Sequence, residues 1–371
     1  MLGFFFNFML YLNLVKHFYK KTDLYILFAA IIAFSFVCCS NTAKPSQQIE
    51  IEDEFDVAEE DENFDDEPLV LPPFGGELPV STFKEVWAYV VAGSESALYK
   101  NLPLSDIGYF SAEVDPYGKL TGVPRRTRLS FPARIHLVVV CNSRSLTHFV
   151  LVPGSQERKE LIADLLAASR NYDGLQIDFE NIPPRDGDTF LSFLKELRAG
   201  LGDKIFSIAL PARTRKISDD VYDYEKIMPY VDRILIMAYD EHWSGSKPGS
   251  IASLQWCKHV AEYTLRVIGK EKLIMGIPFY GRAWGDHNPS RALVYSTTEN
   301  LLKNRTAEIK RENGIPTFDY DVSVSVKVYY EDEYSLSARM EIYRSMNISS
   351  VGFWRLGQET AQVWNIIRLE K

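Results

Sequence analysis

The feature that most constrains this chain is an acidic stretch, residues 173–180, which reads Asp-Gly-Leu-Gln-Ile-Asp-Phe-Glu. From Leu175 onward apolar and polar residues alternate strictly, which is the period-two pattern of a β-strand. Gln176, Asp178 and Glu180 therefore share one face, with the two acids roughly 6–7 Å apart along the backbone. A strand inside a parallel sheet is packed on both faces and gains no stability from such a pair. We therefore expect these acids to take part in a chemical reaction.

Short apolar strands alternate with helical stretches from Phe83 onward, as in a chain of βα units. Helices are predicted at residues 156–169, 189–201, 253–268 and 336–346. Strands are predicted at residues 86–92, 107–113, 134–141, 175–180, 205–212, 233–240, 273–280 and 350–356. The acidic stretch lies on the fourth of these strands. Eight strands in this alternation are typical of a (β/α)8 barrel.

The acidic stretch resembles the signature of family 18 glycoside hydrolases, the chitinase-like barrels, whose pattern is Asp-x-x-Asp-x-Asp-x-Glu. Asp173, Asp178 and Glu180 match its first, third and fourth acids. Gln176 stands at the second, as in the branch that includes spore-cortex-lytic glucosaminidases. Family 18 enzymes also carry this motif on strand four. Three further strand ends resemble family motifs: Met237-Ala238-Tyr239-Asp240, Tyr280-Gly281-Arg282 and Trp354.

The resemblance spans about residues 83–371 and implies an α/β fold, a (β/α)8 TIM barrel. The interval between the seventh and eighth strands is too long for one helix. A small inserted α+β lobe, as in many relatives, is therefore expected at about residues 284–330. We assign the whole catalytic domain to residues 81–371.

The resemblance also implies substrate-assisted retaining hydrolysis, in which the 2-acetamido oxygen of the substrate attacks the anomeric carbon. Glu180 then fits the general acid, Asp178 the residue that holds the acetamido N–H, and Tyr239 a donor to the acetamido carbonyl. The proximity of Asp178 and shielding by aromatic side chains should raise the pKa of the pair. A neutral Gln176 leaves Asp178 with fewer charged competitors. Expected substrate-binding residues are Gln176, Asp240, Tyr280, Arg282 and Trp354.

Several of these residues have a structural alternative. Asp173 is out of phase with the inward face and is better explained as a hydrogen-bonding residue at the strand entry. Trp354 could simply pack inside the barrel, and Arg282 could pair with a loop carboxylate. His242 and Trp243 could line the cleft or only pack their loop.

Residues 1–39 are typical of an export signal, because lysines precede the apolar run from Leu24 to Val37. This run suits a signal-peptide core and is short for a bilayer span. Val37-Cys38-Cys39-Ser40-Asn41 resembles a bacterial lipoprotein cleavage site. We expect lipidation at Cys39, with Cys38, a plain signal peptide or an uncleaved anchor as alternatives. Residues 40–80 carry an acidic run without apolar periodicity and are expected to form a disordered spacer.

The charge of the chain argues against nucleic-acid binding. The net charge is −9, and residues 50–67 contain twelve acids and no base. From residue 68 onward the chain contains 37 basic and 37 acidic residues, so it has no surplus of positive charge to bind a phosphate backbone. Cys141 and Cys257 are isolated and the six histidines lack metal-ligand spacing. We expect buried thiols, no metal and no cofactor.

Two functions without turnover compete with a hydrolase: a catalytically silent sugar-binding protein and a structural envelope lipoprotein with a vestigial cleft. Silent members of family 18 typically lose the acid, whereas Glu180 is present. We therefore expect a monomeric exported hydrolase, lipid-anchored to a bacterial membrane and facing the periplasm or the exterior. Its expected partner is a glycan containing N-acetylglucosamine, with peptidoglycan ahead of chitin.

Overall fold

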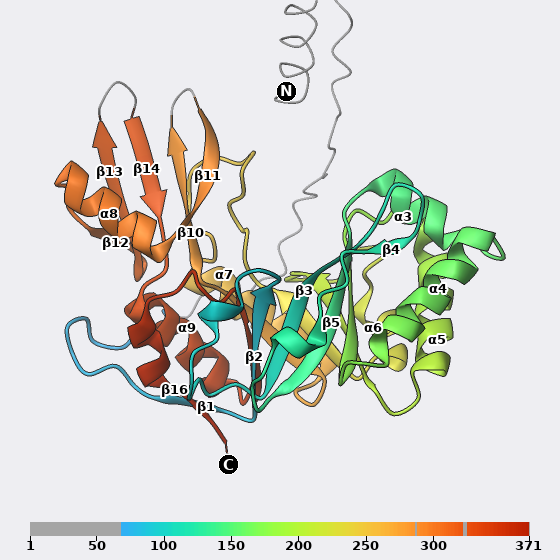
Figure 1. Cartoon of the computed structure of the whole chain (residues 1–371). Coiled ribbons are helices and arrows are strands. Elements are labelled where there is room, and N and C mark those ends of the chain that lie inside the picture. Colours follow the sequence, from blue (N-terminus) through green and yellow to red (C-terminus); the bar gives the residue numbers. More distant parts are fainter. Residues whose placement is uncertain (1–67, 286–287, 322–324, 371) are drawn as a thin grey trace, which may run out of the picture. The chain divides into compact units, whose positions relative to one another are not determined.

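The computed structural model describes residues 68–285, 288–321 and 325–370 (Figure 1). The predicted signal peptide, the candidate lipidation site Cys39 and most of the acidic spacer lie outside these residues. No helix in the described ranges is both long and apolar enough to cross a membrane.

Eight parallel strands close into a barrel in the order β2-β3-β5-β6-β7-β8-β9-β15, and β15 pairs in parallel with β2 to complete the ring. The strands are β2 (Glu85–Val91), β3 (Asp106–Val114), β5 (Arg134–Cys141), β6 (Gly174–Phe179), β7 (Ile205–Pro211), β8 (Arg233–Met237), β9 (Leu273–Pro278) and β15 (Ser350–Trp354). The predicted (β/α)8 barrel is confirmed, and the acidic stretch forms its fourth strand, β6.

The barrel strands form because their sequences suit burial on both faces. In β5, Arg-Ile-His-Leu-Val-Val-Val-Cys, every residue after Arg134 is buried, and all of β6 is buried. Near-continuous apolar runs of β-branched residues are typical of parallel strands covered on both sides. The outer side is covered by helices, as Figure 1 shows for α3, α4 and α5 beside β5.

The helices predicted from sequence are present as α4 (Gln156–Ser169), α5 (Gly187–Leu201), α7 (Leu254–Ile268) and α9 (Glu333–Ser345). Ser155 and Ser253 begin α4 and α7, because each side chain accepts a hydrogen bond from a backbone N–H in the first turn. The structure adds α3 (Arg144–Leu151) and the single turn α6 (Tyr224–Ile227). In the described chain no α-helix links β2 to β3 or β3 to β5; the second connection contains the short strand β4 (Leu120–Thr121).

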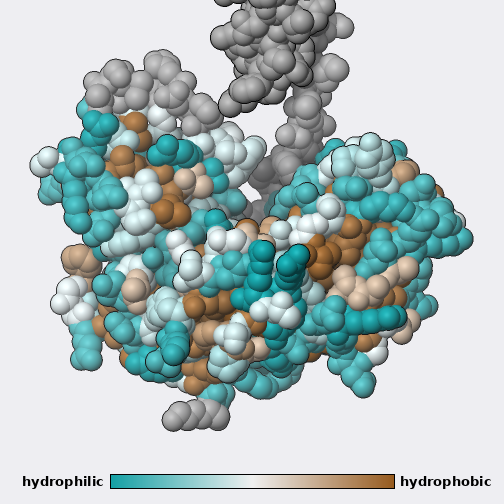
Figure 2. Space-filling model, viewed as in Figure 1, coloured by the Kyte–Doolittle hydropathy of each residue, from teal (hydrophilic) through white to brown (hydrophobic). Residues whose placement is uncertain are grey.

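The predicted α+β insertion between β9 and β15 is also confirmed. Its five-stranded antiparallel sheet has the order β11-β10-β14-β13-β12. The elements are β10 (Tyr280–Gly285), β11 (Asn288–Val294), α8 (Tyr295–Arg305), β12 (Lys310–Glu312), β13 (Ile315–Asp321) and β14 (Ser325–Tyr329). Leu293, Phe318, Val328 and Tyr330 form its core, and Figure 2 shows hydrophobic residues on this lobe among hydrophilic ones. Because the lobe begins at Tyr280, its first strand continues directly from the barrel.

A buried ion pair connects the lobe to the barrel. Glu331 follows β14, and its carboxylate accepts hydrogen bonds from Arg339 of α9 at 3.0 and 2.9 Å. Arg339 also donates to the Ala252 carbonyl oxygen, just before α7, at 2.6 Å. Both charged side chains are almost fully shielded from water, so each depends on its partner to remain buried.

Residues before the barrel also contact it. The Tyr334 hydroxyl donates to the Pro72 carbonyl oxygen at 2.9 Å, and the Arg311 guanidinium lies 4.5 Å from the centre of the Phe74 ring. Strand β1 (Ser81–Phe83) pairs in parallel with β16 (Ile367–Leu369). The described end of the predicted spacer, residues 68–80, was expected to be disordered but packs against the domain, because its aromatic and proline residues find partners there.

The N-terminal end of the barrel is filled by a network of charged side chains. Asp106 accepts hydrogen bonds from Arg134, at 2.7 Å from two nitrogens, and contacts the His136 Nε2 atom at 2.8 Å. Glu85 accepts from Arg233 at 3.0 and 2.8 Å. Burial alone would raise the pKa of both carboxyls, but these partners outweigh it and hold each pKa below its ordinary value.

Candidate active site

The C-terminal end of β6 carries the two carboxyl groups. The strand ends at Phe179, and the Glu180 N–H still donates to the Cys141 carbonyl oxygen of β5 at 3.0 Å. Asp178 is 9% exposed, and Glu180 is half-buried. The Asp178 Oδ1 atom is buried without a hydrogen-bond partner among the described residues. A buried acceptor with no protein donor is costly unless it is protonated or a ligand supplies the donor.

The two carboxyl groups have raised pKa values for related reasons. Burial, followed by the negative charge of Glu180, raises the pKa of Asp178 to about 8. Burial, followed by the charge of Asp240, also raises the pKa of Glu180. The pair therefore retains a proton at neutral pH, in agreement with the expectation from its spacing and shielding.

Gln176 lies two residues before Asp178, on the same face of β6, and is fully buried. Its Oε1 atom accepts from the Tyr89 hydroxyl at 2.7 Å, and its Nε2 atom donates to the Ser207 Oγ atom at 3.1 Å. This differs from the sequence-based expectation of a direct sugar contact. The neutral amide is instead buried and held by these two neighbours on the same face of β6 as Asp178.

The segment after β8 brings three further expected residues together. Asp240 accepts a hydrogen bond from the Tyr280 hydroxyl at 2.6 Å, and the Arg282 Nη2 atom lies 3.5 Å from the same carboxylate oxygen. The predicted alternative for Arg282, pairing with a loop carboxylate, is therefore what the structure shows. Asp240 has a left-handed backbone with φ of 58°, which aspartate tolerates better than most residues. Its charge acts on Glu180 as described above, so these groups share one site.

Tyr239 precedes Asp240 and is half-buried. Its ring packs edge-to-face on Tyr280 with centroids 6.3 Å apart. Burial raises the pKa of its hydroxyl well above the ordinary value, with smaller contributions from nearby tyrosines and from Asp178. The phenol is thus held in its neutral, donating form beside the carboxyl pair.

Trp354 ends β15 and is only partly buried. Its ring lies 5.4 Å from Tyr89 and 5.0 Å from Phe110, between centroids. The peptide bond between Trp354 and Arg355 is cis. The ring packs on the top layer of the barrel interior and remains partly exposed, which is compatible with both sequence-based interpretations, packing and a floor under a sugar.

Structural roles explain Asp173, His242 and the two described cysteines. The Asp173 Oδ2 atom accepts the Ile135 N–H at 2.7 Å, which confirms its expected role at the strand entry. His242 packs its own loop, with Nδ1 2.8 Å from the Ser250 carbonyl oxygen, whereas Trp243 is 51% exposed. Cys141 and Cys257 are buried free thiols, as predicted. In the described part of the chain no cluster of three or more His, Cys, Asp or Glu side chains could hold a metal ion.

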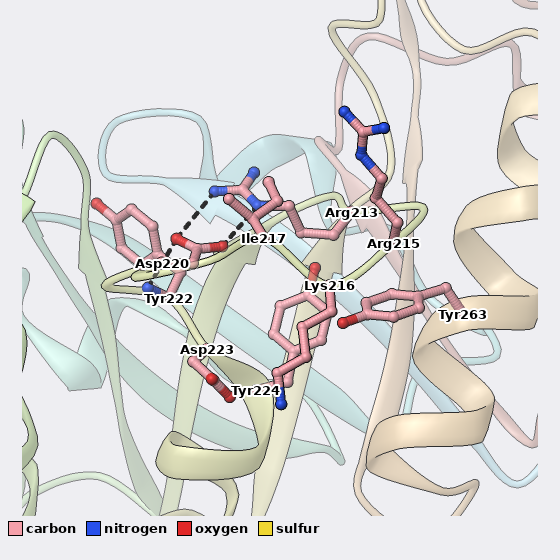
Figure 3. A pocket seen from close by; sticks show the side chains of 9 residues that line it. All are labelled: Arg213, Arg215, Lys216, Ile217, Asp220, Tyr222, Asp223, Tyr224 and Tyr263. Atoms are coloured by element: carbon pink, nitrogen blue, oxygen red, sulfur yellow. Dashed lines mark hydrogen bonds and ion pairs between the residues drawn. The ribbon is translucent and has the colours of Figure 1, made fainter. Parts of the chain in front are cut away.

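Sequence reasoning missed the loop between β7 and α6, residues 212–223. Figure 3 shows a pocket in this loop lined by Arg213, Arg215, Lys216, Ile217, Asp220, Tyr222, Asp223, Tyr224 and Tyr263. Its volume of about 10 Å³ has room for roughly one water molecule, so it does not take a sugar. The loop nevertheless reaches the carboxyl pair, because the Tyr222 hydroxyl donates to the Phe179 carbonyl oxygen at 3.0 Å. No local sequence pattern signals this contact.

A closed parallel barrel whose fourth strand ends in a shielded carboxyl pair defines the class of TIM-barrel glycoside hydrolases. The family model described as glycosyl hydrolases family 18 matches residues 137–359, more than half of the chain. The chain belongs to this family.

Two relatives and one solved structure illustrate the similarity. The chain is 31% identical over 215 residues to YvbX of Bacillus subtilis (strain 168), an uncharacterised glycosylase, covering 55% of this chain and 62% of YvbX. It is 23% identical over 290 residues to the cortical fragment-lytic enzyme of Bacillus anthracis, covering 71% of this chain and 67% of that enzyme. The crystal structure of the Bacillus cereus spore cortex-lytic enzyme SleL shares the fold, with a TM-score of 0.68, 21% identity and coverage of 79% and 76%.

Proposed function

We propose that this protein is a glycoside hydrolase that cleaves β-1,4 bonds next to N-acetylglucosamine by substrate-assisted retaining catalysis. The observation that carries the proposal is the Asp178–Glu180 pair. Its raised pKa values keep a proton available at neutral pH, and the buried Asp178 Oδ1 atom lacks a donor among the described residues. A substrate acetamido N–H is the donor that this oxygen needs.

The two carboxyl groups take different parts in the reaction. The pair shares one proton, which passes to Glu180 when the substrate N–H reaches Asp178. Glu180 donates this proton to the glycosidic oxygen while the 2-acetamido oxygen of the substrate attacks the anomeric carbon and the glycosidic bond breaks. The resulting oxazolinium ion is positively charged and is stabilised by Asp178, which accepts the acetamido N–H. Tyr239, held in its neutral form, donates to the acetamido oxygen. Glu180 then accepts a proton from a water molecule, whose oxygen bonds to the anomeric carbon. The bond between this carbon and the acetamido oxygen breaks, so the oxazolinium ring opens with net retention at the anomeric carbon.

The remaining residues hold the sugar. Trp354 offers a partly exposed aromatic face under the pyranose ring. Asp240, Tyr280 and Arg282 form one hydrogen-bonded group at the rim and contact sugar hydroxyls. Gln176, two residues before Asp178 on the same face of β6, supplies a neutral amide where a carboxylate would add a second negative charge.

We propose peptidoglycan, ahead of chitin, as the substrate. Gln176 at the second motif position and a relative named as a cortical fragment-lytic enzyme support this choice. The export signal with a lipidated Cys39, read from sequence, would keep the hydrolase at the bacterial membrane, facing cell-wall glycan in the periplasm or outside the cell.

Turnover of purified glycan tests the proposal. Wild type should release fragments from peptidoglycan strands, detected by mass spectrometry, and the new anomeric centre should be β in proton NMR. Glu180→Gln should lower kcat by about 10³-fold, since general acids contribute roughly 10²–10⁴. Glu271→Gln, an exposed residue just before β9 at the opposite end of the barrel, is the matched control and should keep full activity.

The outcomes separate the competing functions. Binding of glycan without turnover by wild type would identify a silent sugar-binding protein. Neither binding nor turnover would point to a structural envelope protein. Faster cleavage of chitin oligosaccharides than of peptidoglycan would leave the hydrolase intact and reverse the substrate preference.

A further inference from the structure

The Tyr222 hydroxyl bridges the backbone on both sides of Glu180. It donates to the Phe179 carbonyl oxygen at 3.0 Å and accepts the Ile182 N–H at 3.1 Å. One side-chain oxygen thus satisfies a donor and an acceptor that flank the proposed acid. Because Tyr222 belongs to the β7–α6 loop, a separate segment of the chain determines where this backbone lies.

The bridge matters because the Glu180 side chain has little else to hold it. Among the described residues no hydrogen bond or ion pair to its carboxyl group is found. The backbone leaves β6 at this residue, and the next one, Asn181, has a left-handed conformation with φ of 58°. Asn181 is itself tied by its carbonyl oxygen to Thr147 at 3.3 Å. The position of the carboxyl group therefore follows from its backbone rather than from partners of its own.

Hydrogen bonds within the loop hold the segment that carries Tyr222 (Figure 3). The Asp220 carboxylate accepts the Tyr222 backbone N–H at 3.0 Å, and it accepts the Arg213 Nε–H at 2.7 Å. Arg213 lies just after β7, and its pair with Asp220 is mostly shielded from water. A chain of direct contacts therefore runs from the end of β7 through Arg213, Asp220 and Tyr222 to the backbone at Glu180.

We propose that Tyr222 is a positioning residue for the acid–base group Glu180, held in place by the Arg213–Asp220 pair. The inference rests on the proposed function, because it assigns a task to Tyr222 only if Glu180 transfers the proton. Burial raises the pKa of the Tyr222 hydroxyl to about 12, so it remains a donor across the working pH range. Its second contact, as an acceptor, completes the bridge.

Removing this oxygen should let the Glu180 carboxyl group move toward water. Tyr222→Phe keeps the ring but leaves the Phe179 carbonyl and the Ile182 N–H without their shared partner. With less burial, the pKa of Glu180 should fall toward its ordinary value. Glu180 would then lose its proton at lower pH. The alkaline limb of the pH profile of kcat should therefore shift to lower pH, while KM stays within about two-fold.

The kinetic experiment compares Tyr222→Phe with Tyr224→Phe. Tyr224 lies two residues further along, and its hydroxyl donates to the Pro211 carbonyl oxygen at 2.6 Å without touching the Glu180 backbone. We expect Tyr222→Phe to lower kcat by about 10-fold or more, as displacement of a reacting group does, and to shift the alkaline limb. Tyr224→Phe should leave the profile unchanged. Equal profiles for Tyr222→Phe and wild type, or equal shifts in both variants, would overturn the proposal.

A spectroscopic readout works without turnover. The Glu180 side-chain carboxyl carbon, labelled with ¹³C and assigned through Glu180→Gln, should titrate at lower pH in Tyr222→Phe than in wild type. Asp220→Asn, which keeps an acceptor for the Tyr222 N–H but removes the charge paired with Arg213, should give a smaller shift and covers the case in which Tyr222→Phe does not fold. An unchanged carboxyl titration in both variants would reject the positioning role, whereas an inactive wild type with a shifted titration would reject only the hydrolase.

Discussion

Carboxyl groups are buried at both ends of the barrel interior, and they meet opposite environments there. At the N-terminal end Asp106 is fully buried against Arg134 and His136, and its pKa is held below the ordinary value. At the C-terminal end Asp178 is also buried, but one of its oxygens has no partner in the described chain and its pKa rises to about 8. Burial acts on both in the same direction, so the partners decide the sign of the shift.

The difference separates stability from reactivity within one barrel. A paired carboxylate stabilises the fold, whereas an unpaired buried carboxyl costs free energy unless it is protonated. In TIM barrels the N-terminal end contributes stability and the C-terminal end carries the site. Here the partners at the N-terminal end come from residues far apart in sequence, such as Arg233 and Glu85, which are 148 residues apart.

The largest expected contrast is in the free energy of unfolding. Asp106→Asn should lower it by about 3 kcal/mol, because it leaves the charge of Arg134 beside a buried amide. Asp178→Asn should leave it unchanged or raise it at pH 7, because the amide does not need the proton that Asp178 must retain. Urea denaturation of both variants measures this contrast. A comparable loss of stability in both would contradict the division between the two ends.

The same pair of variants sharpens the contrast when pH is varied. The native pKa of Asp178, about 8, exceeds its unfolded value of about 3.9, so the native state binds the extra proton between these values. Its contribution to stability is present below pH 4 and is lost as pH rises toward 8. Asp178→Asn should remove that decline. Asp106 has the opposite sign: its contribution is present above its unfolded pKa and is lost as pH falls through the lowered native pKa.

An intermediate effect is expected at Gln176, which lies between the two ends. Gln176→Asp adds a like charge below Asp178, where Tyr89 and Ser207 can still hold a carboxylate. The acid limb of the hydrolysis profile should then move by about one pH unit. Ser207→Ala removes a partner of the amide without adding charge and should keep the wild-type profile. If Gln176→Asp and wild type gave the same profile, the neutral amide would have no influence on the pair.

The smallest effect is expected at the rim. Tyr280→Phe removes the hydroxyl that donates to Asp240 at 2.6 Å. The loss of one such bond should reduce kcat/KM by about 2–10-fold, in line with about 0.5–1.5 kcal/mol for a hydrogen bond. Tyr320→Phe, in β13 of the lobe, serves as control. A loss approaching that of Glu180→Gln would place Tyr280 in the proton-transfer step instead of the rim.

The barrel and its carboxyl pair could be predicted because they depend on local patterns. Alternation in residues 175–180 assigned the inward face, and apolar runs located the eight strands. The direction of the pKa shift followed from two acids on one shielded face. Helix α3 was missed although Ser143 precedes it and caps it, because the segment is only eight residues long.

The contacts that orient the site could not be predicted, because they join distant segments. The Tyr222 hydroxyl meets the Phe179 carbonyl across 43 residues of chain, and nothing in the sequence around either residue indicates the other. Gln176 was expected among the substrate-binding residues because it belongs to the strand-four motif that the resemblance assigns to catalysis. Its burial depends on Tyr89 from another strand, which only the closed barrel brings into reach.

The chain leaves the barrel to form the inserted lobe and returns to the barrel at nearly the same place. Arg282 at its beginning pairs in register with Tyr329 at its end, and a Cβ atom placed on Gly281 would meet the Tyr329 carbonyl oxygen at 2.5 Å. Residues 283–328 could therefore be excised, and Arg282 joined to Tyr329 by a short turn, with little change of path. The lobe is thus an exchangeable module, and a different one could be grafted there to change glycan choice while β6 and its acid are left as they are.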